Sequence, residues 1–248
     1  MTAGCRPDNE VSVASMNRVI ITGASSGIGR AIATRFLLDG SLVLNLSRRP
    51  CPERGVENLA CDLADPAALD SFAEPIRAWL ADADRVCLVH NASVMRRDRI
   101  DALASEDLRA VLELALVAPN RLNQLVLPHM GAGSSILYIG STLAEKAVPG
   151  VASYVIAKHG LAGMMRATCQ DLAGRGIHTC MICPGFTDTE QIRAMIGDDP
   201  ATLAAISALS AFDRLIEPEE IAEVAYFAAH SPVINGALIH ANLGQRER

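Results

Sequence analysis

A stretch near the start of the chain, residues 18–29, reads RVIITGASSGIG. Its first part, residues 18–22, is rich in β-branched side chains and predicts a short buried strand. Beyond it, residues 27–38 carry apolar side chains at helical spacing. A strand that runs through a glycine-rich turn into a helix is typical of α/β proteins that bind a dinucleotide.

The turn itself supplies the groups that a phosphate needs. Gly23, Gly27 and Gly29 lack a Cβ, so the backbone can turn sharply and come close to a pyrophosphate at the helix N-terminus. Ser25 and Ser26 add hydroxyl donors. Three residues separate the first two glycines, instead of the single residue of the common dinucleotide fingerprint. The alternative is a tight turn that binds nothing.

The rest of the chain alternates between strand-like and helical patterns. We expect further strands at 42–46, 57–60, 85–89, 135–139, 177–182 and 237–240, and helices at 67–80, 105–130, 152–172 and after Pro218. This order predicts a single α/β domain, a Rossmann-type doubly wound parallel sheet with helices on both faces. Ligands of such sheets bind beyond the carboxyl ends of the strands, where the strand order reverses.

Composition and chain ends narrow the class of protein. A net charge of −6 argues against nucleic acid as the main partner, because phosphate backbones require a basic surface. No apolar run is long enough to predict a membrane span. We expect residues 1–15 to be a disordered extension and residues 16–248 to form the domain, with Met1 or Met16 as the start.

The cysteines indicate neither a disulfide framework nor a metal site. There are seven, without paired spacing. The one close pair, Cys180 and Cys183, lies in an apolar run and is predicted to be two buried free thiols. A cytoplasmic protein follows as the expectation.

The second predicted strand ends in Ser47, Arg48 and Arg49. A site for NAD usually carries an acidic residue about twenty residues beyond the glycine turn, whereas the 2′-phosphate of NADP requires arginine. No acid occurs at this strand end, Arg48 can pair bidentately with a phosphate, and Ser47 can donate a hydrogen bond. The sequence favours NADP(H) over NAD(H); the alternative is a solvated basic turn.

Two further strand ends carry candidate cofactor contacts. After the third strand, Asp62 and Leu63 are placed to meet an adenine amino group, although Asp62 could instead cap the next helix. After the fourth strand, Asn91 is expected to hold its loop against the glycine turn. Ala92 and Ser93 would then lie beside the cofactor.

A third group of residues predicts proton transfer. Tyr154 and Lys158 are four residues apart in a helical stretch, so both side chains lie on one face. A nearby ammonium and an oxidised nicotinamide would both lower the pKa of the phenol from its usual value of about 10. Ser141 ends the fifth strand, where its hydroxyl can polarise a carbonyl that Tyr154 protonates. The spacing Tyr-x-x-x-Lys alone is common by chance, so its weight comes from Ser141 and the glycine turn.

Together these segments resemble the short-chain dehydrogenase/reductase family over residues 16–240. The motifs that carry the resemblance, specific as an ordered set, are Thr22 to Gly29, Asp62-Leu63, Asn91-Ala92, Leu127-Pro128-His129-Met130, Ser141, Tyr154 with Lys158, Pro184-Gly185 through Thr189, and Pro218-Glu219-Glu220-Ile221-Ala222. The resemblance implies that Ser141 orients the substrate oxygen, that Tyr154 is the acid/base, and that Lys158 lowers the pKa of Tyr154 and binds the nicotinamide ribose.

The resemblance also implies that Pro184 and Gly185 line the nicotinamide pocket and that Thr189 touches the carboxamide. The expected cofactor contacts are Gly23, Ser25, Ser26, Gly27, Ile28, Gly29, Ser47, Arg48, Arg49, Asp62, Leu63, Asn91, Ala92, Ser93, Tyr154, Lys158, Pro184, Gly185, Thr187 and Thr189.

The chain departs from the family pattern at three places. Ala115 stands where the family usually has an asparagine that holds a water next to the lysine, so proton delivery is expected to be slower or to use another route. Ser93 replaces the glycine of Asn-Ala-Gly. Residues 241–244 lack the usual glycine pair at an end that often packs in a tetramer, so both a homodimer and a homotetramer are consistent with the sequence.

The leading hypothesis is an NADP(H)-dependent oxidoreductase that interconverts a ketone or aldehyde and an alcohol. Residues 188–212 are expected to cover a small, apolar substrate, and Arg96, Arg97 and Arg99 either meet an anionic substrate or form a solvated loop. The alternatives are a catalytically weak NAD(P)-binding sensor, which Ala115 favours, and a partner subunit of a hetero-oligomer, which the altered C-terminus favours.

Overall fold

The computed structural model describes residues 17–197 and 199–246, and the expected extension, residues 1–15, lies outside this range. A seven-stranded sheet with the order β3-β2-β1-β4-β5-β6-β7 runs through the molecule, and every neighbouring pair is parallel. Its strands are β1 (Asn17–Thr22), β2 (Leu42–Ser47), β3 (Val56–Ala60), β4 (Arg85–His90), β5 (Ser135–Ile139), β6 (His178–Pro184) and β7 (Ala237–Ala241). The predicted Rossmann-type fold class is confirmed.

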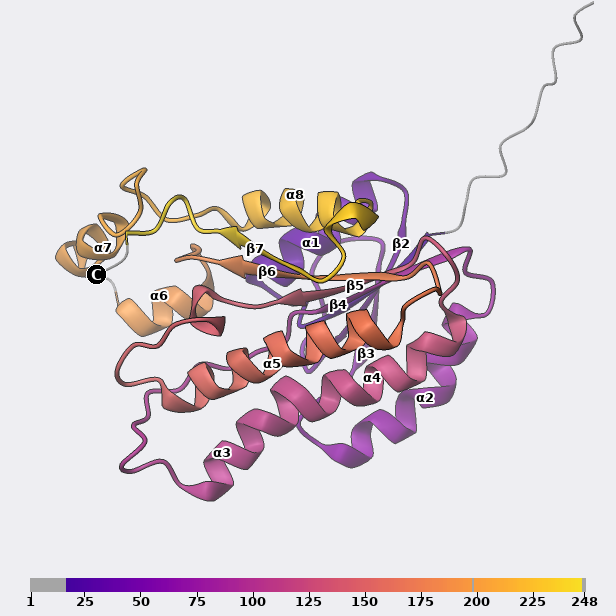
Figure 1. The fold of residues 1–248 in the computed structure, drawn as a ribbon, viewed down its shortest axis with the longest axis horizontal. Helices are drawn as coiled ribbons and strands as arrows, with labels where there is room; N and C mark the ends of the chain where they lie inside the picture. The colour runs from indigo at the N-terminus through magenta and orange to yellow at the C-terminus, as the bar shows by residue number, and fades with distance from the viewer. Residues whose placement is uncertain (1–16, 198, 247–248) are drawn as a thin grey trace, which may run out of the picture.

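Helices cover both faces of this sheet (Figure 1). The α-helices of the described residues are α1 (Gly27–Leu38), α2 (Pro66–Leu80), α3 (Ser105–Leu112), α4 (Ala118–Val126), α5 (Ala152–Asp171), α6 (Glu190–Ile196), α7 (Pro200–Ser207) and α8 (Pro218–Ala229). Helices α1 and α8 lie on one face, and α2, α4 and α5 lie on the other. No helix in the described residues is both long and apolar enough to cross a bilayer.

Alternating side chains of the central strands divide the core into two layers. In β1, Ile20 points toward the α2, α4 and α5 layer, whereas Val19 and Ile21 point toward the α1 and α8 layer. All three are at most 1% exposed. Burial on both faces explains why the central strands are continuous apolar runs, as expected for a parallel sheet.

The predicted helix over 105–130 is wrong as a single continuous element. It is interrupted by a π-helical segment, Glu113–Val117, and closes with a 3₁₀ turn, Leu127–His129. Pro119 supplies the reason for the first break, because it has no N–H to donate to the carbonyl of Ala115 four residues earlier. Pro128 lies in the 3₁₀ turn for the same reason.

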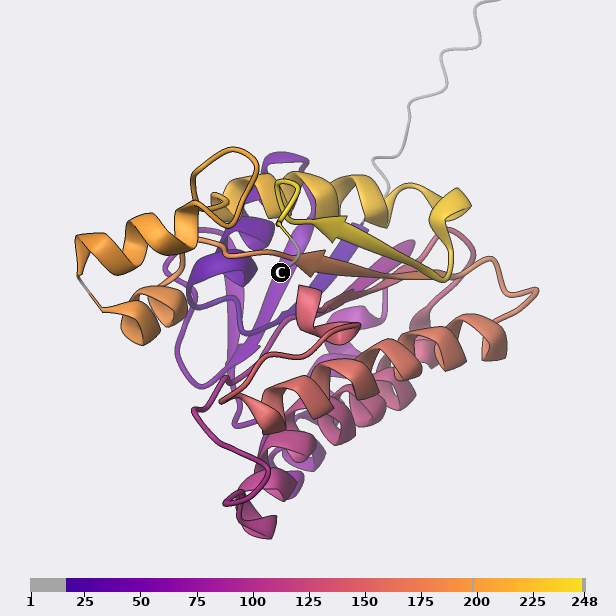
Figure 2. The same cartoon turned by 60° about the vertical axis from the view of Figure 1, so that its left-hand side comes forward.

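The segment expected to cover the substrate contains two helices whose bounds the sequence does not predict, α6 and α7. Thr189 caps the first of them by accepting a hydrogen bond from the N–H of Ile192, and Asp199 caps the second. Figures 1 and 2 place both helices beyond the carboxyl end of β6. They therefore lie over the edge of the sheet at which ligands of such folds bind.

The glycine turn between β1 and α1 allows close backbone packing. Gly23 and Gly27 have φ angles of +74° and +54°, which favour glycine. At Gly29 a Cβ would lie 2.4 Å from the carbonyl oxygen of Gly23 and 2.5 Å from Nδ2 of Asn91. The first turn of α1 thus packs directly on the ends of β1 and β4.

We predict that Gly29→Ala lowers the free energy of unfolding by about 2–4 kcal/mol, because a Cβ here displaces backbone and not a flexible side chain. Urea unfolding followed by circular dichroism measures the change. The matched control is Gly163→Ala in α5, where a Cβ meets no atom within 4 Å. That variant should gain about 0.5–1 kcal/mol from helix propensity. Equal effects of the two substitutions would contradict the packing described here.

Candidate active site

The predicted site residues gather at the carboxyl ends of β1, β4, β5 and β6. The strand order reverses between β1 and β4, because β2 and β3 extend the sheet in one direction and β5, β6 and β7 in the other. Asn91 and Ala92 follow β4, and Ser141 follows β5. A crevice forms at such a reversal, and the family of folds binds its ligands there.

Four hydrogen bonds join the ends of β1 and β4. The hydroxyl of Thr22 accepts the N–H groups of Asn91 and Ala92, at 2.9 and 3.0 Å. The carboxamide of Asn91 donates to the carbonyl oxygens of Thr22 and Gly23, at 3.0 and 3.1 Å. The prediction that Asn91 holds its loop against the glycine turn is confirmed.

The N-terminus of α1 has the properties of an anion site. Ser26 occupies its N-cap position, makes no side-chain capping bond, and is followed by no acidic residue in the first turn. The first N–H groups of the helix therefore lack a side-chain acceptor and carry the positive end of the helix dipole. Ser25, Ser26 and Ile28 are half-buried around this end. These residues fit a pyrophosphate, so the site can hold a dinucleotide.

A buried asparagine that was not predicted from the sequence, Asn45, connects the glycine turn to the turn at Arg48 and Arg49 after β2. Asn45 is fully buried in β2, and its Oδ1 accepts the N–H of Ala24 at 2.9 Å. Its Nδ2 donates to the carbonyl oxygen of Arg49 at 3.2 Å and to Oδ1 of Asn58 at 2.9 Å. A single polar residue inside an otherwise apolar strand was the available signal.

The end of β2 presents arginines to solvent. Ser47 donates its hydroxyl to the carbonyl oxygen of Arg49 at 2.6 Å, which tightens the turn. Arg48 is exposed, and Nη2 of Arg49 lies 3.7 Å from a carboxylate oxygen of Glu190 at the start of α6. Such an exposed pair contributes little to stability, so Arg49 remains able to bind an anion.

Asp62 and Leu63 differ in their surroundings. Asp62 accepts the N–H of Ala64 at 3.0 Å and is exposed, while the cap of α2 is Asp65, which accepts the N–H of Ala67 at 2.9 Å. The alternative of Asp62 as the helix cap is therefore wrong. Leu63 is 5% exposed and lies in the core beside the end of β4.

Ser141, Tyr154 and Lys158 come together from β5 and α5. Ser141 accepts the N–H of Leu143 at 3.1 Å, which leaves its hydroxyl hydrogen available to donate. Lys158 is 4% exposed and donates from Nζ to the carbonyl oxygen of Ile139 at 2.8 Å. The same Nζ lies 5.3 Å from the centre of the Tyr154 ring. One face of α5 thus presents a phenol and an ammonium to the end of β5.

Burial controls the proton affinities of this group. Burial raises the pKa of Tyr154 to about 12, while its hydrogen bond with Ser141 acts in the opposite direction. Burial lowers the pKa of Lys158 from 10.5 to about 8. The protein groups alone therefore keep the phenol protonated at neutral pH. A decrease in the pKa of Tyr154 is expected only when a cationic ring is also bound.

The thiols on β6 are buried, as predicted. Cys180 and Cys183 are free and each is 0% exposed. Burial raises the pKa of the first to about 12 and of the second to about 11. Neither thiol is a nucleophile at neutral pH, and the described residues contain no cluster of three possible metal ligands.

The turn after β6 leads from the end of that strand into residues 188–212, the segment expected to cover the substrate. The N–H of Gly185 donates to the carbonyl oxygen of Ala241 at 3.1 Å, and the Thr187 hydroxyl donates to the carbonyl of Gly185 at 3.2 Å. Thr189 uses its hydroxyl to cap α6, and its methyl group lies close to Gly27. The cover therefore begins directly against the glycine turn.

The arginines that follow β4 are engaged with protein groups. Arg96 pairs with Asp107 at 2.7 Å, and Arg99 pairs with Asp101 at 3.1 Å. Arg97 donates to the carbonyl oxygen of Met195 in α6 at 2.7 Å and so connects this loop to the cover. The exposed ion pairs of Arg96 and Arg99 fit the predicted solvated loop, whereas neither alternative predicted the contact of Arg97 with α6.

Comparison with known proteins matches this geometry. The family described as enoyl-(acyl carrier protein) reductase matches residues 23–245. This chain belongs to the short-chain dehydrogenase/reductase family. It is therefore a member of a family of NAD(P)-dependent oxidoreductases, and the family prediction from the sequence is confirmed.

Relatives match this short-chain dehydrogenase/reductase over most of its length. The 3-oxoacyl-(acyl-carrier-protein) reductase FabG of Salmonella typhimurium is 31% identical over 241 residues, covering 91% of this chain and 95% of the relative. FabG of Escherichia coli K12 is 31% identical over 238 residues, with the same coverage of each chain.

Solved structures share the fold. The ligand-free aldohexose dehydrogenase of Thermoplasma acidophilum matches with a TM-score of 0.85 and 25% identity, covering 93% of this chain and 94% of the other. A short-chain dehydrogenase of Burkholderia cenocepacia in complex with NADP matches with a TM-score of 0.82 and 27% identity, covering 93% and 98%.

The depressed pKa of Lys158 predicts a specific pH dependence of stability. Below about pH 8 the amine is charged in both states, and the folded state bears the cost of burying it. Above about pH 10.5 it is neutral in both states and this cost is absent. Between these values the unfolded chain binds more protons, so stability increases with pH.

We expect the wild type to gain roughly 3 kcal/mol in free energy of unfolding relative to Lys158→Met as the pH rises from about 7 to about 11. Urea unfolding at a series of pH values measures the difference. Ser141→Ala, which retains the buried ammonium, is the control and should follow the wild type. Parallel curves for the wild type and Lys158→Met would mean that Lys158 is not desolvated.

Proposed function

We propose that this protein catalyses the NADP(H)-dependent interconversion of a small ketone or aldehyde and the corresponding alcohol. The observation that carries the proposal is the meeting of Ser141, Tyr154 and Lys158 at the carboxyl end of β5, beside the uncapped N-terminus of α1. A proton donor and an anion site on the same edge of the sheet suit a reaction that couples proton and hydride transfer.

Ser141, Tyr154 and Lys158 each have a separate role in this reaction. A nicotinamide held at this edge of the sheet would supply the hydride chemistry. The Ser141 hydroxyl donates a hydrogen bond to the substrate oxygen; the N–H of Leu143 occupies one of its two acceptor lone pairs and leaves its hydrogen free to donate. Tyr154 is protonated at neutral pH and gives its proton to the same oxygen during reduction. The Lys158 ammonium stabilises the phenolate that results, and would also hold the cofactor ribose.

Selectivity for NADP(H) rests on the end of β2. Arg48 is exposed, has no ion-pair partner within residues 17–197 and 199–246, and follows a strand without a terminal acid. Its guanidinium suits bidentate binding of a 2′-phosphate. Arg49 adds a second positive charge at the same turn.

The substrate class follows from the cover. Ile192, Met195 and Ile196 of α6 are half-buried, and an apolar cover favours a carbonyl compound with an apolar substituent. The name of the FabG relatives makes 3-oxoacyl thioesters one class to test. A homodimer or homotetramer and a cytoplasmic location stay predictions. The alternatives, a weakly active NAD(P)-binding sensor and a partner subunit, are separated from the enzyme by turnover.

We predict that Tyr154→Phe reduces kcat for carbonyl reduction by about 10²–10⁴-fold, the usual contribution of a positioned proton donor. Its affinity for NADPH should stay within about threefold of the wild type, because the phenol is not part of the anion site. A carbonyl panel followed at the nicotinamide absorbance, together with fluorescence titration of NADPH, measures both. Nucleotide binding without turnover in the wild type would favour the sensor.

We predict that Arg48→Asp weakens NADPH binding by about 10–100-fold, because a charge-assisted contact to the 2′-phosphate is lost and replaced by repulsion. Binding of NADH should change little. Arg54→Asp is the matched control. Arg54 is exposed and lies two residues before the start of β3, and so near the amino ends of the strands and away from the carboxyl ends where the cofactor is expected. If NADPH and NADH weaken equally in Arg48→Asp, the proposed cofactor preference is wrong.

A further inference from the structure

The first turn of α5 carries Tyr154 but contains no capping side chain of its own. Its N-cap is Val151, whose side chain makes no hydrogen bond to the helix, and no acidic residue occurs in the first turn. The first N–H groups of a helix have no partner within the helix. Ser153 is 0% exposed, so its N–H requires a partner from another part of the protein.

Asp98, in the loop after β4, supplies that partner. Its Oδ1 accepts the N–H of Ser153 at 2.9 Å, and its Oδ2 accepts the hydroxyl of the same residue. The backbone of Asp98 adds two bonds, because its carbonyl oxygen accepts the N–H of Ala152 at 3.3 Å and its N–H donates to the carbonyl oxygen of Gly150 at 3.0 Å. A carboxylate at this point also meets the positive end of the helix dipole. The start of α5 therefore depends on a residue 55 positions away from Ser153.

The carboxylate of Asp98 is itself fixed in place. Asp98 is half-buried and pairs with Val151 in an isolated parallel β-bridge, so the side chains next to it in this extended segment point to the opposite side. One of these, Arg97, donates to the carbonyl oxygen of Met195 in α6 at 2.7 Å. The segment is thereby anchored both to α5 and to the helix that begins the cover.

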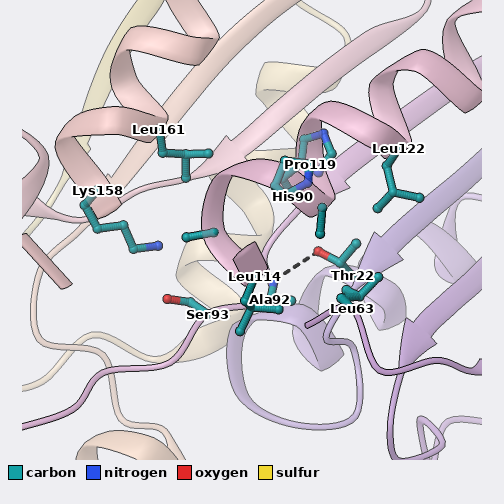
Figure 3. Close-up of a pocket in the computed structure, with 12 residues that line it drawn as sticks. Thr22, Leu63, His90, Ala92, Ser93, Leu114, Pro119, Leu122, Lys158 and Leu161 are labelled. Carbon is teal, nitrogen blue, oxygen red and sulfur yellow. Dashed lines mark hydrogen bonds between the residues drawn. The ribbon is translucent and has the colours of Figure 1, made fainter. Parts of the chain in front are cut away.

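The rest of α5 is fixed by burial instead. Lys158 and Leu161 line a cavity between this helix and α4 (Figure 3), and Met165 is 0% exposed. These residues lie at least one turn beyond Tyr154, and a helix end without a cap frays. Within the first turn, the buried side chain is that of Ser153, which is the one that Asp98 binds.

The position of the phenol follows that of Ser153, because Tyr154 is the next residue in the chain. A shift of Ser153 moves Tyr154 relative to Ser141, with which the phenol forms a hydrogen bond. A misplacement of a reacting group by about 1 Å can lower a rate by about 100-fold. The contact with Asp98 therefore lies where a small displacement has a large effect on catalysis.

We propose that Asp98 is a positioning residue for the proton donor: through Ser153 it fixes the first turn of α5, and with it the distance from Tyr154 to the substrate oxygen. The proposal rests on the proposed function, in which Tyr154 gives a proton to that oxygen. In this role Asp98 exchanges no proton and acts only through the helix. Its removal slows the proton-transfer step and leaves the binding of NADPH and of the carbonyl compound unchanged.

Two substitutions at Asp98 and one control separate this role from a general contribution to stability. Asp98→Ala removes both side-chain contacts with Ser153 and keeps the backbone bonds of residue 98. Asp98→Asn is the conservative variant, because it keeps an oxygen for the N–H of Ser153 and a polar partner for its hydroxyl. Asp65→Ala is the matched control. Asp65 caps α2 by accepting the N–H of Ala67 at 2.9 Å, and α2 contains no predicted site residue.

The readouts are the steady-state kcat and KM in H₂O and D₂O and the melting temperature. We expect Asp98→Ala to lower kcat for carbonyl reduction about 10–100-fold and to increase its solvent isotope effect, with KM and the affinity for NADPH within about threefold of the wild type. Asp98→Asn should stay within about threefold in kcat. Asp98→Ala and Asp65→Ala should both lower the melting temperature by about 2–6 °C, whereas Asp65→Ala should keep the wild-type kcat.

A substitution at Ser153 tests whether Asp98 acts through this residue. Ser153→Ala removes the hydroxyl and keeps the N–H contact, so it should lower kcat by about 3–10-fold, less than Asp98→Ala does. In a protein that already carries Asp98→Ala, the same substitution should change kcat by less than about twofold, because the partner of the hydroxyl is already absent.

Three results would overturn the proposal. The first is a wild-type kcat and isotope effect in Asp98→Ala or, if that variant does not fold, in Ser153→Ala. The second is an equal loss of kcat in Asp65→Ala, because the loss of any helix cap would then be sufficient. The third is a double variant in which the losses caused by the Asp98 and Ser153 substitutions multiply.

A measurement without turnover separates this proposal from the proposed function. If the wild type reduces no carbonyl compound, the proposed function fails. The ¹³Cζ chemical shift of Tyr154, assigned with the Tyr154→Phe variant, still tests the positioning. It should change in Asp98→Ala and stay the same in Asp65→Ala, and an unchanged shift in Asp98→Ala contradicts the role of Asp98.

Discussion

The ends of β1 and β4 meet through Thr22 and Asn91, and the geometry of the site depends on this contact. The segments that follow these two parallel strands leave in opposite directions, so the last backbone N–H and C=O groups of the strands lose their sheet partners and need other hydrogen bonds. Here the Thr22 hydroxyl and the Asn91 carboxamide take up those groups in four hydrogen bonds. Gly29 then packs against the joined ends, which places the N-terminus of α1 over the reversal of strand order. The uncapped N-terminus of α1 and the group of Ser141, Tyr154 and Lys158 consequently lie at one edge of the sheet.

A second constraint is the burial of Lys158. An ammonium removed from water opposes folding unless hydrogen bonds compensate for the lost hydration. The protein provides the carbonyl oxygen of Ile139 for it. The same burial brings the pKa of Lys158 to about 8, which is the range in which a group exchanges protons readily at neutral pH.

Much of the fold was accessible from the sequence because its signals are local. The apolar runs of the central strands and the periodicity of α1 and α5 depend only on which residues are neighbours along the chain. The glycines of the first turn belong to the same category. The interruption at Glu113–Val117 was missed although Pro119 is a local signal, because the apolar pattern continues through it. Asn45 was missed, and the contact of Arg97 with α6 was not predicted, because the partners of both side chains lie on other elements.

The sequence by itself determined the parallel sheet, the family, and the residue types at the two halves of the site, since periodicity and ordered motifs are properties of the chain. The tertiary structure alone decided how these groups interact. Asp65, and not Asp62, caps α2. Arg97 connects the loop after β4 to α6. His90 and Lys158 line one cavity only because β4, α4 and α5 pack together. Burial, and with it the pKa of each group, arises from packing between distant segments, which no local pattern encodes.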